Sequence, residues 1–175
     1  MFDDIDEITQ AGILPARWLR RAVQENIIYS DKYKIQEQNY QPASLDLSLG
    51  EKAYSLQCSF LPFSDTVETK LPELTIGEID IRDGAILEKN RAYLIPLLEE
   101  LRLPQGIRAR TNPKSSTGRL DIFTRVISDY SDRFDDIAEG YEGRMFLEVF
   151  SRSFTIKVKT RLSLNQLRLF KGDSR

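Results

Sequence analysis

Histidine is absent from this chain of 175 residues, and cysteine occurs only once. Without histidine the chain cannot form a Ser-His-Asp or Cys-His catalytic site, and it cannot hold zinc through an imidazole ring. A zinc-dependent nucleobase deaminase is also excluded, because its metal needs one histidine with two cysteines, or three cysteines. Any chemistry must therefore come from carboxylates, hydroxyls, lysine, arginine, bound water or a metal carried by the substrate.

Long apolar runs are missing as well. No segment approaches the length needed to cross a membrane, and the first residues, Met-Phe-Asp-Asp-Ile-Asp-Glu, are acidic where a secretory signal is basic and then apolar. The single cysteine, Cys58, cannot form an intramolecular disulfide, which agrees with a reducing compartment. These absences predict a cytoplasmic protein that has no membrane partner.

The composition is typical of one ordinary globular domain. Hydrophobic residues make up 41% of the chain and charged residues 30%, and the length suffices for one core but not comfortably for two. No linker or fixed-period repeat divides the sequence. We expect residues 1–12, which are acidic and end in a glycine, to form a flexible tail, and residues 13–175 to form the domain.

Hydrophobic periodicity predicts one short helix and many strands. In residues 14–23, apolar side chains recur at i, i+3 and i+4 behind a proline suited to a first helical turn. From residue 43 onward the period changes to two, first in residues 45–49 and then in residues 54–60. Further short runs of this kind lie at residues 79–81, 92–97, 107–111, 122–127, 144–153, 154–158 and 164–170. The pattern predicts an all-β sandwich, jelly roll or barrel with one short N-terminal helix.

Residues 112–119, Asn-Pro-Lys-Ser-Ser-Thr-Gly-Arg, combine turn residues with hydroxyls and cations. From Arg108 to Arg125, five basic residues stand against one acid, Asp121, so the local balance is +4 in a chain whose net charge is −2. This contrast favours a small, highly charged ligand over a long polyanion such as a nucleic acid. The alternative is a solvated basic turn, and the spacing of a Walker P-loop is absent.

Glu148 is the most unusual acid in the sequence. It lies in the strand-like run 144–150, on the same face as Phe146 and Phe150. A carboxylate between two aromatic side chains costs free energy unless it is paired or used. Glu148 is therefore a candidate general acid or base, and a buried ion pair with an arginine is an equally good interpretation.

Four short motifs follow one another along the chain. They are residues 41–50 (Gln-Pro-Ala-Ser-Leu-Asp-Leu-Ser-Leu-Gly), 113–119 (Pro-Lys-Ser-Ser-Thr-Gly-Arg), 140–148 (Gly-Tyr-Glu-Gly, then Leu-Glu) and 165–167 (Asn-Gln-Leu). In this order they resemble the motifs of the dCTP deaminases of the trimeric dUTPase superfamily. The resemblance extends to a bacterial subgroup whose chains carry a second, related half. We therefore expect this chain to be the N-terminal half of such a longer 2'-deoxycytidine 5'-triphosphate deaminase.

The resemblance implies an architecture and a reaction. It implies a distorted jelly roll, or dUTPase-like β-barrel, that assembles as a homotrimer with active sites between subunits. It also implies that dCTP is deaminated to dUTP and ammonia in pyrimidine deoxynucleotide metabolism. Zinc is not expected, the protein itself ligates no metal, and Mg²⁺ is held through the substrate triphosphate.

The resemblance also implies roles for individual residues at matching motif positions. Three are catalytic. Glu148 is the general base that activates water, and Arg119 and Ser115 hold the cytosine ring and the water. Three are substrate contacts, Lys114, Ser116 and Gln166, for the phosphates. The 128–140 loop is longer than in the usual dCTP deaminases, so its residues cannot be matched to the family, and Asp129 is our own candidate for a substrate contact there.

Two departures from the family pattern keep alternatives open. Relatives that also cleave the triphosphate carry an aspartate two residues before the Gly-Tyr pair, where this chain has Ala138. This favours simple deamination over a dUTP diphosphatase or a bifunctional deaminase and diphosphatase. The C-terminal arm that commonly closes over the triphosphate in the family has no counterpart in residues 171–175. A non-catalytic, nucleotide-binding or trimerising half of a longer enzyme is therefore the third interpretation.

Overall fold

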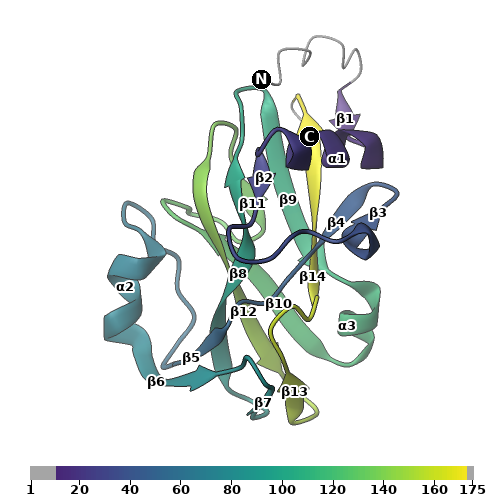
Figure 1. Cartoon of the computed structure of the whole chain (residues 1–175). Coiled ribbons are helices and arrows are strands. Elements are labelled where there is room, and N and C mark those ends of the chain that lie inside the picture. The colour runs from purple at the N-terminus through teal and green to yellow at the C-terminus, as the bar shows by residue number, and fades with distance from the viewer. Residues whose placement is uncertain (1–10, 173–175) are drawn as a thin grey trace.

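The fold consists of antiparallel sheets with few helices, and the computed structural model describes residues 11–172 (Figure 1). One sheet has the strand order β11 (Asp136–Ile137), β9 (Ile107–Pro113), β14 (Asn165–Lys171), β4 (Ser44–Leu47) and β3 (Tyr40–Gln41), with β1 (Gly12–Ile13) paired to β14. The other has the order β10 (Ile122–Ser128), β12 (Glu142–Ser151), β8 (Ala92–Arg102), β5 (Lys52–Leu56) and β6 (Thr75–Asp80), with β2 (Ile28–Tyr29) paired to β8. A separate pair joins β7 (Ala85–Leu87) to β13 (Ile156–Val158). The all-β prediction is confirmed at this level, although the sheets do not close into a barrel.

The main core consists of aliphatic side chains from both sheets and the first helix. Leu47 of β4, Leu147 of β12 and Leu167 of β14 are fully buried in it, together with Leu19. Burying one such side chain contributes about 1.5–3 kcal/mol. Most of the flexible tail predicted for residues 1–12 lies outside the described residues, and Gly12 pairs with Lys171 in the β1–β14 ladder.

The predicted N-terminal helix is confirmed as α1 (Ala16–Gln24), which begins after Pro15. Its apolar face buries Trp18, Leu19 and Ala22 and packs on β3 and β4. None of the helices within residues 11–172 is both long and apolar enough to span a membrane.

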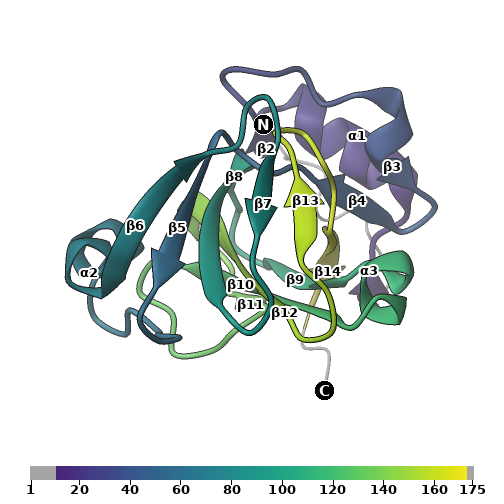
Figure 2. The ribbon, with the colours of Figure 1, turned by 90° about the horizontal axis from the view of Figure 1, so that it is seen from below.

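The expectation of a single helix was wrong, because residues 11–172 contain two more besides a 3₁₀ turn at Glu37–Asn39. In α2 (Val67–Leu74), Thr66 caps the first turn by accepting a hydrogen bond from the Thr69 amide at 3.2 Å, and Pro72 lies within the helix. Pro72 is a turn signal in the sequence, which concealed this helix. Figures 1 and 2 both place α2 beside β5 and β6, and α3 on the other side of the molecule near β9 and β14.

The basic segment 112–119 is also partly helical, since its residues Ser115–Arg119 form the single helical turn α3. The strand predicted for residues 54–60 is shorter than expected. β5 ends at Leu56, so Cys58 and Ser59 belong to a loop rather than to an alternating strand. This loop matters because it places Ser59 next to β12.

Candidate active site

Glu148 lies on the interior strand β12, between Arg125 of β10 and Leu94 of β8. Only 5% of the residue is exposed. A cavity of about 830 Å³ opens beside it, and the backbone region of the basic loop contributes Pro113 and Gly118 to the wall. The structure therefore brings the sheltered acid and part of the basic loop to one cavity, although 35 positions separate Pro113 from Glu148 in the sequence.

The Glu148 carboxylate is fully paired. Arg125 donates to Oε1 from Nη2 at 2.6 Å and from Nε at 3.2 Å, and Ser59 donates its hydroxyl to Oε2 at 2.5 Å. Arg125 Nη2 also donates to Ser59 Oγ at 2.9 Å, which closes a three-residue network. The arginine lies over the ring of Phe134, 3.9 Å from its centroid.

The buried ion pair that the sequence left open is thus confirmed. Sequence analysis did not identify Arg125 and Ser59 as the partners of Glu148. The signal for Arg125 is the antiparallel register, which places it directly across from Glu148, and this register follows only from pairing β10 with β12. No sequence signal indicated Ser59, because its loop was predicted as strand.

The turn α3 is held to the rest of the protein by one buried side chain, and several of its other side chains are exposed. Thr117 is buried and donates its hydroxyl to the Leu164 carbonyl at 2.8 Å. Ser115, Ser116 and Arg119 are exposed. Among the described residues, those that line the Glu148 cavity do not include Ser115 or Arg119. Within one chain, the two predicted catalytic partners of Glu148 therefore do not line its cavity.

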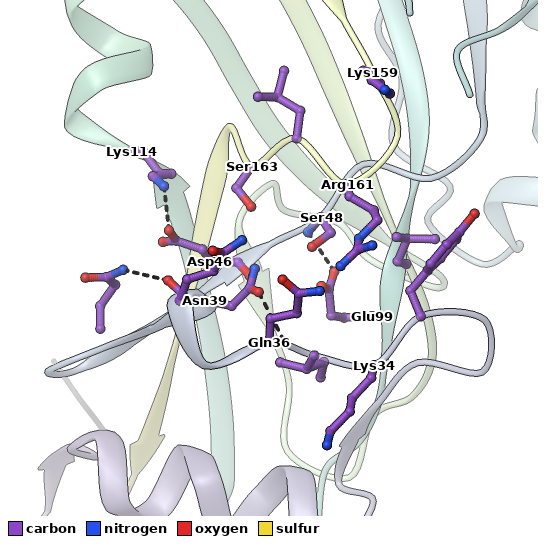
Figure 3. Close-up of a pocket in the computed structure, with 16 residues that line it drawn as sticks. Lys34, Gln36, Asn39, Asp46, Ser48, Glu99, Lys114, Lys159, Arg161 and Ser163 are labelled. Carbon is purple, nitrogen blue, oxygen red and sulfur yellow. Dashed lines mark hydrogen bonds and ion pairs between the residues drawn. The ribbon is translucent and has the colours of Figure 1, made fainter. Parts of the chain in front are cut away.

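Lys114 and Gln166 lie beside a different carboxylate, Asp46 of β4. The Lys114 ammonium contacts Asp46 Oδ2 at 2.5 Å, and Gln166 is the cross-strand neighbour of Asp46 and accepts a hydrogen bond from Ser44 Oγ at 3.0 Å. These two predicted phosphate contacts are thus close to each other. Lys114 lines a second cavity, shown in Figure 3.

That second cavity, of about 780 Å³, is polar and contains two buried acids. Glu99 of β8 is 2% exposed, and its carboxylate accepts a hydrogen bond from the Ser48 amide at 2.8 Å. Burial raises the pKa of Glu99 to about 7, only partly opposed by this hydrogen bond. Sequence analysis missed Glu99, although an acid within the leucine-rich run 97–103 was a visible signal.

Asp129 has a structural contact at the end of β10. Its carboxylate accepts a hydrogen bond from the Val67 amide at 2.8 Å, which caps the start of α2. Its own amide donates to the Tyr141 hydroxyl at 3.1 Å, and burial raises the pKa of that tyrosine. Asp129 lines a third cavity, of about 340 Å³, rather than the Glu148 cavity. Its predicted contact with substrate stays a prediction.

No metal centre can be assigned within residues 11–172, since no three acidic or cysteine side chains there are grouped to hold an ion.

Comparison with known proteins now identifies the family. The model of the 2'-deoxycytidine 5'-triphosphate deaminase (DCD) N-terminal domain matches residues 10–173. The chain belongs to this family. Among its curated relatives, the "dCTP deaminase, dUMP-forming" of Methanothermobacter thermautotrophicus is 29% identical over 139 residues, which are 79% of this chain and 68% of the relative. That of Sulfurihydrogenibium sp. is 24% identical over 164 residues, 93% of this chain and 86% of the relative.

A solved structure of a family member has the same fold. The crystal structure of 2'-deoxycytidine 5'-triphosphate deaminase from Agrobacterium tumefaciens matches with a TM-score of 0.89 and 43% sequence identity. The match covers 93% of this chain but 48% of the Agrobacterium protein. This chain therefore spans about half the length of that relative.

Proposed function

We propose that this chain deaminates dCTP to dUTP and ammonia, by itself or as the N-terminal half of a longer deaminase. The observation that carries the proposal is the buried Glu148 carboxylate, held by Arg125 and Ser59 at a cavity that the basic loop also lines. The membership of the chain in a dCTP deaminase family supports the same reaction.

In the proposed mechanism, Glu148 removes a proton from water as the oxygen attacks the amino-bearing carbon of cytosine. Glu148 delivers this proton to the ring nitrogen, which keeps it, and then carries the proton of the newly added hydroxyl to the amino group. The carbon–nitrogen bond breaks, ammonia leaves and a uracil carbonyl remains. The Arg125 guanidinium keeps the carboxylate oriented, and Ser115 and Arg119 stabilise the charge that develops at the tetrahedral stage.

The exposed positions of Ser115 and Arg119 support a site that two subunits share. Because these side chains do not line the Glu148 cavity of their own chain, we propose that they serve the cavity of a neighbour in a homotrimer. We also propose that the fold is a distorted jelly roll and that the protein is located in the cytoplasm.

Phosphate contacts complete the proposal. Lys114, Ser116 and Gln166 would bind the triphosphate, with Mg²⁺ arriving on its oxygens. Asp129 would reach the substrate only if its bond to Val67 were released, so it is the weakest member of the proposed set. The expected partner remains dCTP, with no nucleic acid or membrane involved.

The decisive experiment follows ammonia release from dCTP and Mg²⁺ with the parent and with Glu148→Gln. We expect the variant to lose about 10²–10⁴-fold in kcat, the usual contribution of a general base. The matched control is Glu68→Gln, which alters an exposed glutamate paired with Arg144 and should leave the rate unchanged. A folded Glu148→Gln variant that is as active as the parent would refute the assignment.

A bifunctional reaction is the second candidate, because the two curated relatives described above are named dUMP-forming. Ala138 counts against it, since the carboxylate expected for cleavage of the triphosphate is missing there. Chromatography of the reaction products separates the two: dUTP indicates deamination alone, whereas dUMP with pyrophosphate indicates both reactions.

A non-catalytic half is the third candidate, because the chain spans 48% of the Agrobacterium relative. In that case the isolated chain would bind dCTP and release no ammonia. The full-length protein, assayed alongside, would then be active.

A further inference from the structure

The segment between β10 and β11, residues 129–135, contacts the ion pair of Glu148. Phe134 in this segment is half-buried, and the Arg125 guanidinium lies 3.9 Å from the centroid of its ring. Among the described residues, those that line the Glu148 cavity include Arg125 and Glu148 but not Phe134. Phe134 therefore contacts the partner of the proposed general base without lining the cavity that faces this base.

The ring contact restricts an arginine that is otherwise free to move. The side chain of Arg125 is 43% exposed, whereas that of Glu148 is 6% exposed. A long exposed side chain loses rotamer freedom when an ion pair fixes it, which weakens the pair. The face of an aromatic ring attracts a guanidinium and supports its plane. Phe134 thus offsets part of the entropy that is lost when Arg125 is held on Glu148.

Asp135 fixes the backbone next to Phe134. Its Oδ1 accepts hydrogen bonds from the Thr111 hydroxyl at 2.7 Å and from the Val126 amide at 2.8 Å. Its amide donates to the Val126 carbonyl at 2.9 Å, and its carbonyl accepts from the Thr111 amide at 3.0 Å. The residue that follows Phe134 is thereby joined to the residue that follows Arg125, so the ring and the guanidinium are held at neighbouring backbone positions.

The same segment is joined to the loop that carries Ser59. The Phe63 amide donates to the Ser131 carbonyl at 3.1 Å, and the Tyr130 amide donates to the Asp65 carbonyl at 3.0 Å. Both groups that donate hydrogen bonds to the carboxylate of the proposed general base are therefore next to this segment, one through a ring contact and one through the backbone.

We propose that Phe134, fixed by Asp135, is a positioning residue that holds the Arg125 guanidinium on the Glu148 carboxylate. The proposal rests on the proposed deamination and adds to it a residue that acts through Arg125 rather than on the substrate. Because Arg125 orients the general base, the loss of the ring should lower kcat and leave KM nearly unchanged.

The first test measures ammonia release from dCTP and Mg²⁺ with Phe134→Leu, which keeps an apolar side chain but removes the ring face. We expect kcat to fall about fivefold, as for the loss of a partly exposed cation–π contact. Phe134→Tyr keeps the ring face and should restore kcat.

Phe63→Leu is the matched control for this test. It makes the same substitution at a ring that is 63% exposed in the Ser59 loop, and it should leave kcat unchanged. A folded Phe134→Leu variant with the kcat of the parent would overturn the proposal. An equal loss in Phe63→Leu would also overturn it, because the effect would then not depend on the ring over Arg125.

The second test needs no turnover. In the parent, Arg125 donates from Nε to Glu148 Oε1 at 3.2 Å, so exchange of the Nε hydrogen with solvent reports how often this pair opens. We expect nitrogen-15 NMR to show about fivefold faster exchange in Phe134→Leu, and exchange like that of the parent in Phe134→Tyr. The signal is assigned by its absence from Arg125→Met. Unchanged exchange in Phe134→Leu would overturn the proposal.

Asp135→Gly and Asp135→Asn test the second residue of the proposal. The φ of Asp135 is 60°, which glycine adopts without strain and asparagine more readily than most residues. Glycine removes the acceptor, whereas asparagine keeps an oxygen for it. We expect faster exchange of the Arg125 Nε hydrogen in Asp135→Gly alone. Equal exchange in the two variants would remove Asp135 from the proposal.

The two readouts separate this proposal from the proposed function. If no form of the protein releases ammonia but exchange at Arg125 Nε responds as expected, the deaminase assignment fails and the positioning of Arg125 by Phe134 stands. If ammonia is released and neither kcat nor exchange responds to Phe134→Leu, the positioning role fails and the deaminase assignment stands.

Discussion

Two buried glutamates on neighbouring strands, Glu148 of β12 and Glu99 of β8, have opposite surroundings. Glu148 is met by a guanidinium and a hydroxyl, whereas Glu99 accepts a hydrogen bond from the Ser48 amide and has no cation among the causes of its pKa. Both residues are at least 95% buried. The two glutamates are therefore buried to a similar extent, and they differ in the groups that pair with their carboxylates.

The partners also decide what each acid can do. Glu148 and its ion-pair partner Arg125 both line a cavity, which suits a group that accepts and returns a proton in the proposed reaction. The Glu99 carboxylate joins β8 to the start of the loop after β4. Its pKa of about 7 means that the folded protein binds the Glu99 proton more tightly than the unfolded chain does. Variants of each acid or of its partners test this contrast.

The largest expected effect is on Glu99. Its pKa is about 7 in the folded protein and 4.5 ordinarily, so the unfolded chain releases this proton first and stability falls as the pH rises from 4.5 to 7. The loss is about 3 kcal/mol above pH 7. Glu99→Gln should therefore raise the free energy of unfolding by about 3 kcal/mol at pH 8 relative to the parent, with little gain at pH 4.5.

Urea denaturation of both proteins across this pH range measures the difference. Because the chain has no histidine, few other groups titrate between pH 5 and 8, which makes the comparison clean. A difference in unfolding free energy between Glu99→Gln and the parent that does not change with pH would contradict the raised pKa of Glu99.

The next effect concerns the partner of Glu148. Arg125→Met keeps much of the apolar stem of the side chain but leaves a buried carboxylate unpaired. We expect a loss of about 2 kcal/mol in unfolding free energy, less than for a fully buried pair because Arg125 is 43% exposed.

Arg144→Met is the matched control. Arg144 also pairs with a glutamate and lies near a phenylalanine ring, but its partner Glu68 is 63% exposed. Its loss should stay below about 1 kcal/mol. Equal losses in the two variants, measured by urea denaturation, would show that burial of the glutamate does not matter.

The smallest effect is expected for Ser59, which positions Glu148. This prediction rests on the proposed deamination. Ser59→Ala should lower kcat about tenfold with KM nearly unchanged, since a hydrogen bond to a charged group contributes about 1.5 kcal/mol. The pH profile of kcat should also shift, and Ser59→Thr should restore both. Ser131→Ala, at a half-buried serine bonded to a backbone carbonyl, is the control. An unchanged kcat and pH profile in Ser59→Ala would remove Ser59 from the site.

Sequence patterns predicted the local features well. The 3.6-residue period of residues 14–23 predicted α1, and the two-residue period predicted most strands, because side-chain direction repeats within a single element. Among the misses, α2 was concealed by Pro72, and the end of β5 at Leu56 was not visible in an alternation that continued to Phe60.

The sequence by itself determined that histidine chemistry is impossible, that the fold is mostly β and that Glu148 needs a partner. Only the tertiary structure decided which partner it has and that Lys114 pairs with Asp46, 68 positions away. It also decided that Asp46 and Glu99 share a cavity. The physical reason is that periodicity describes one strand at a time, whereas ion pairs and cavities depend on register and packing between strands that are distant in the chain.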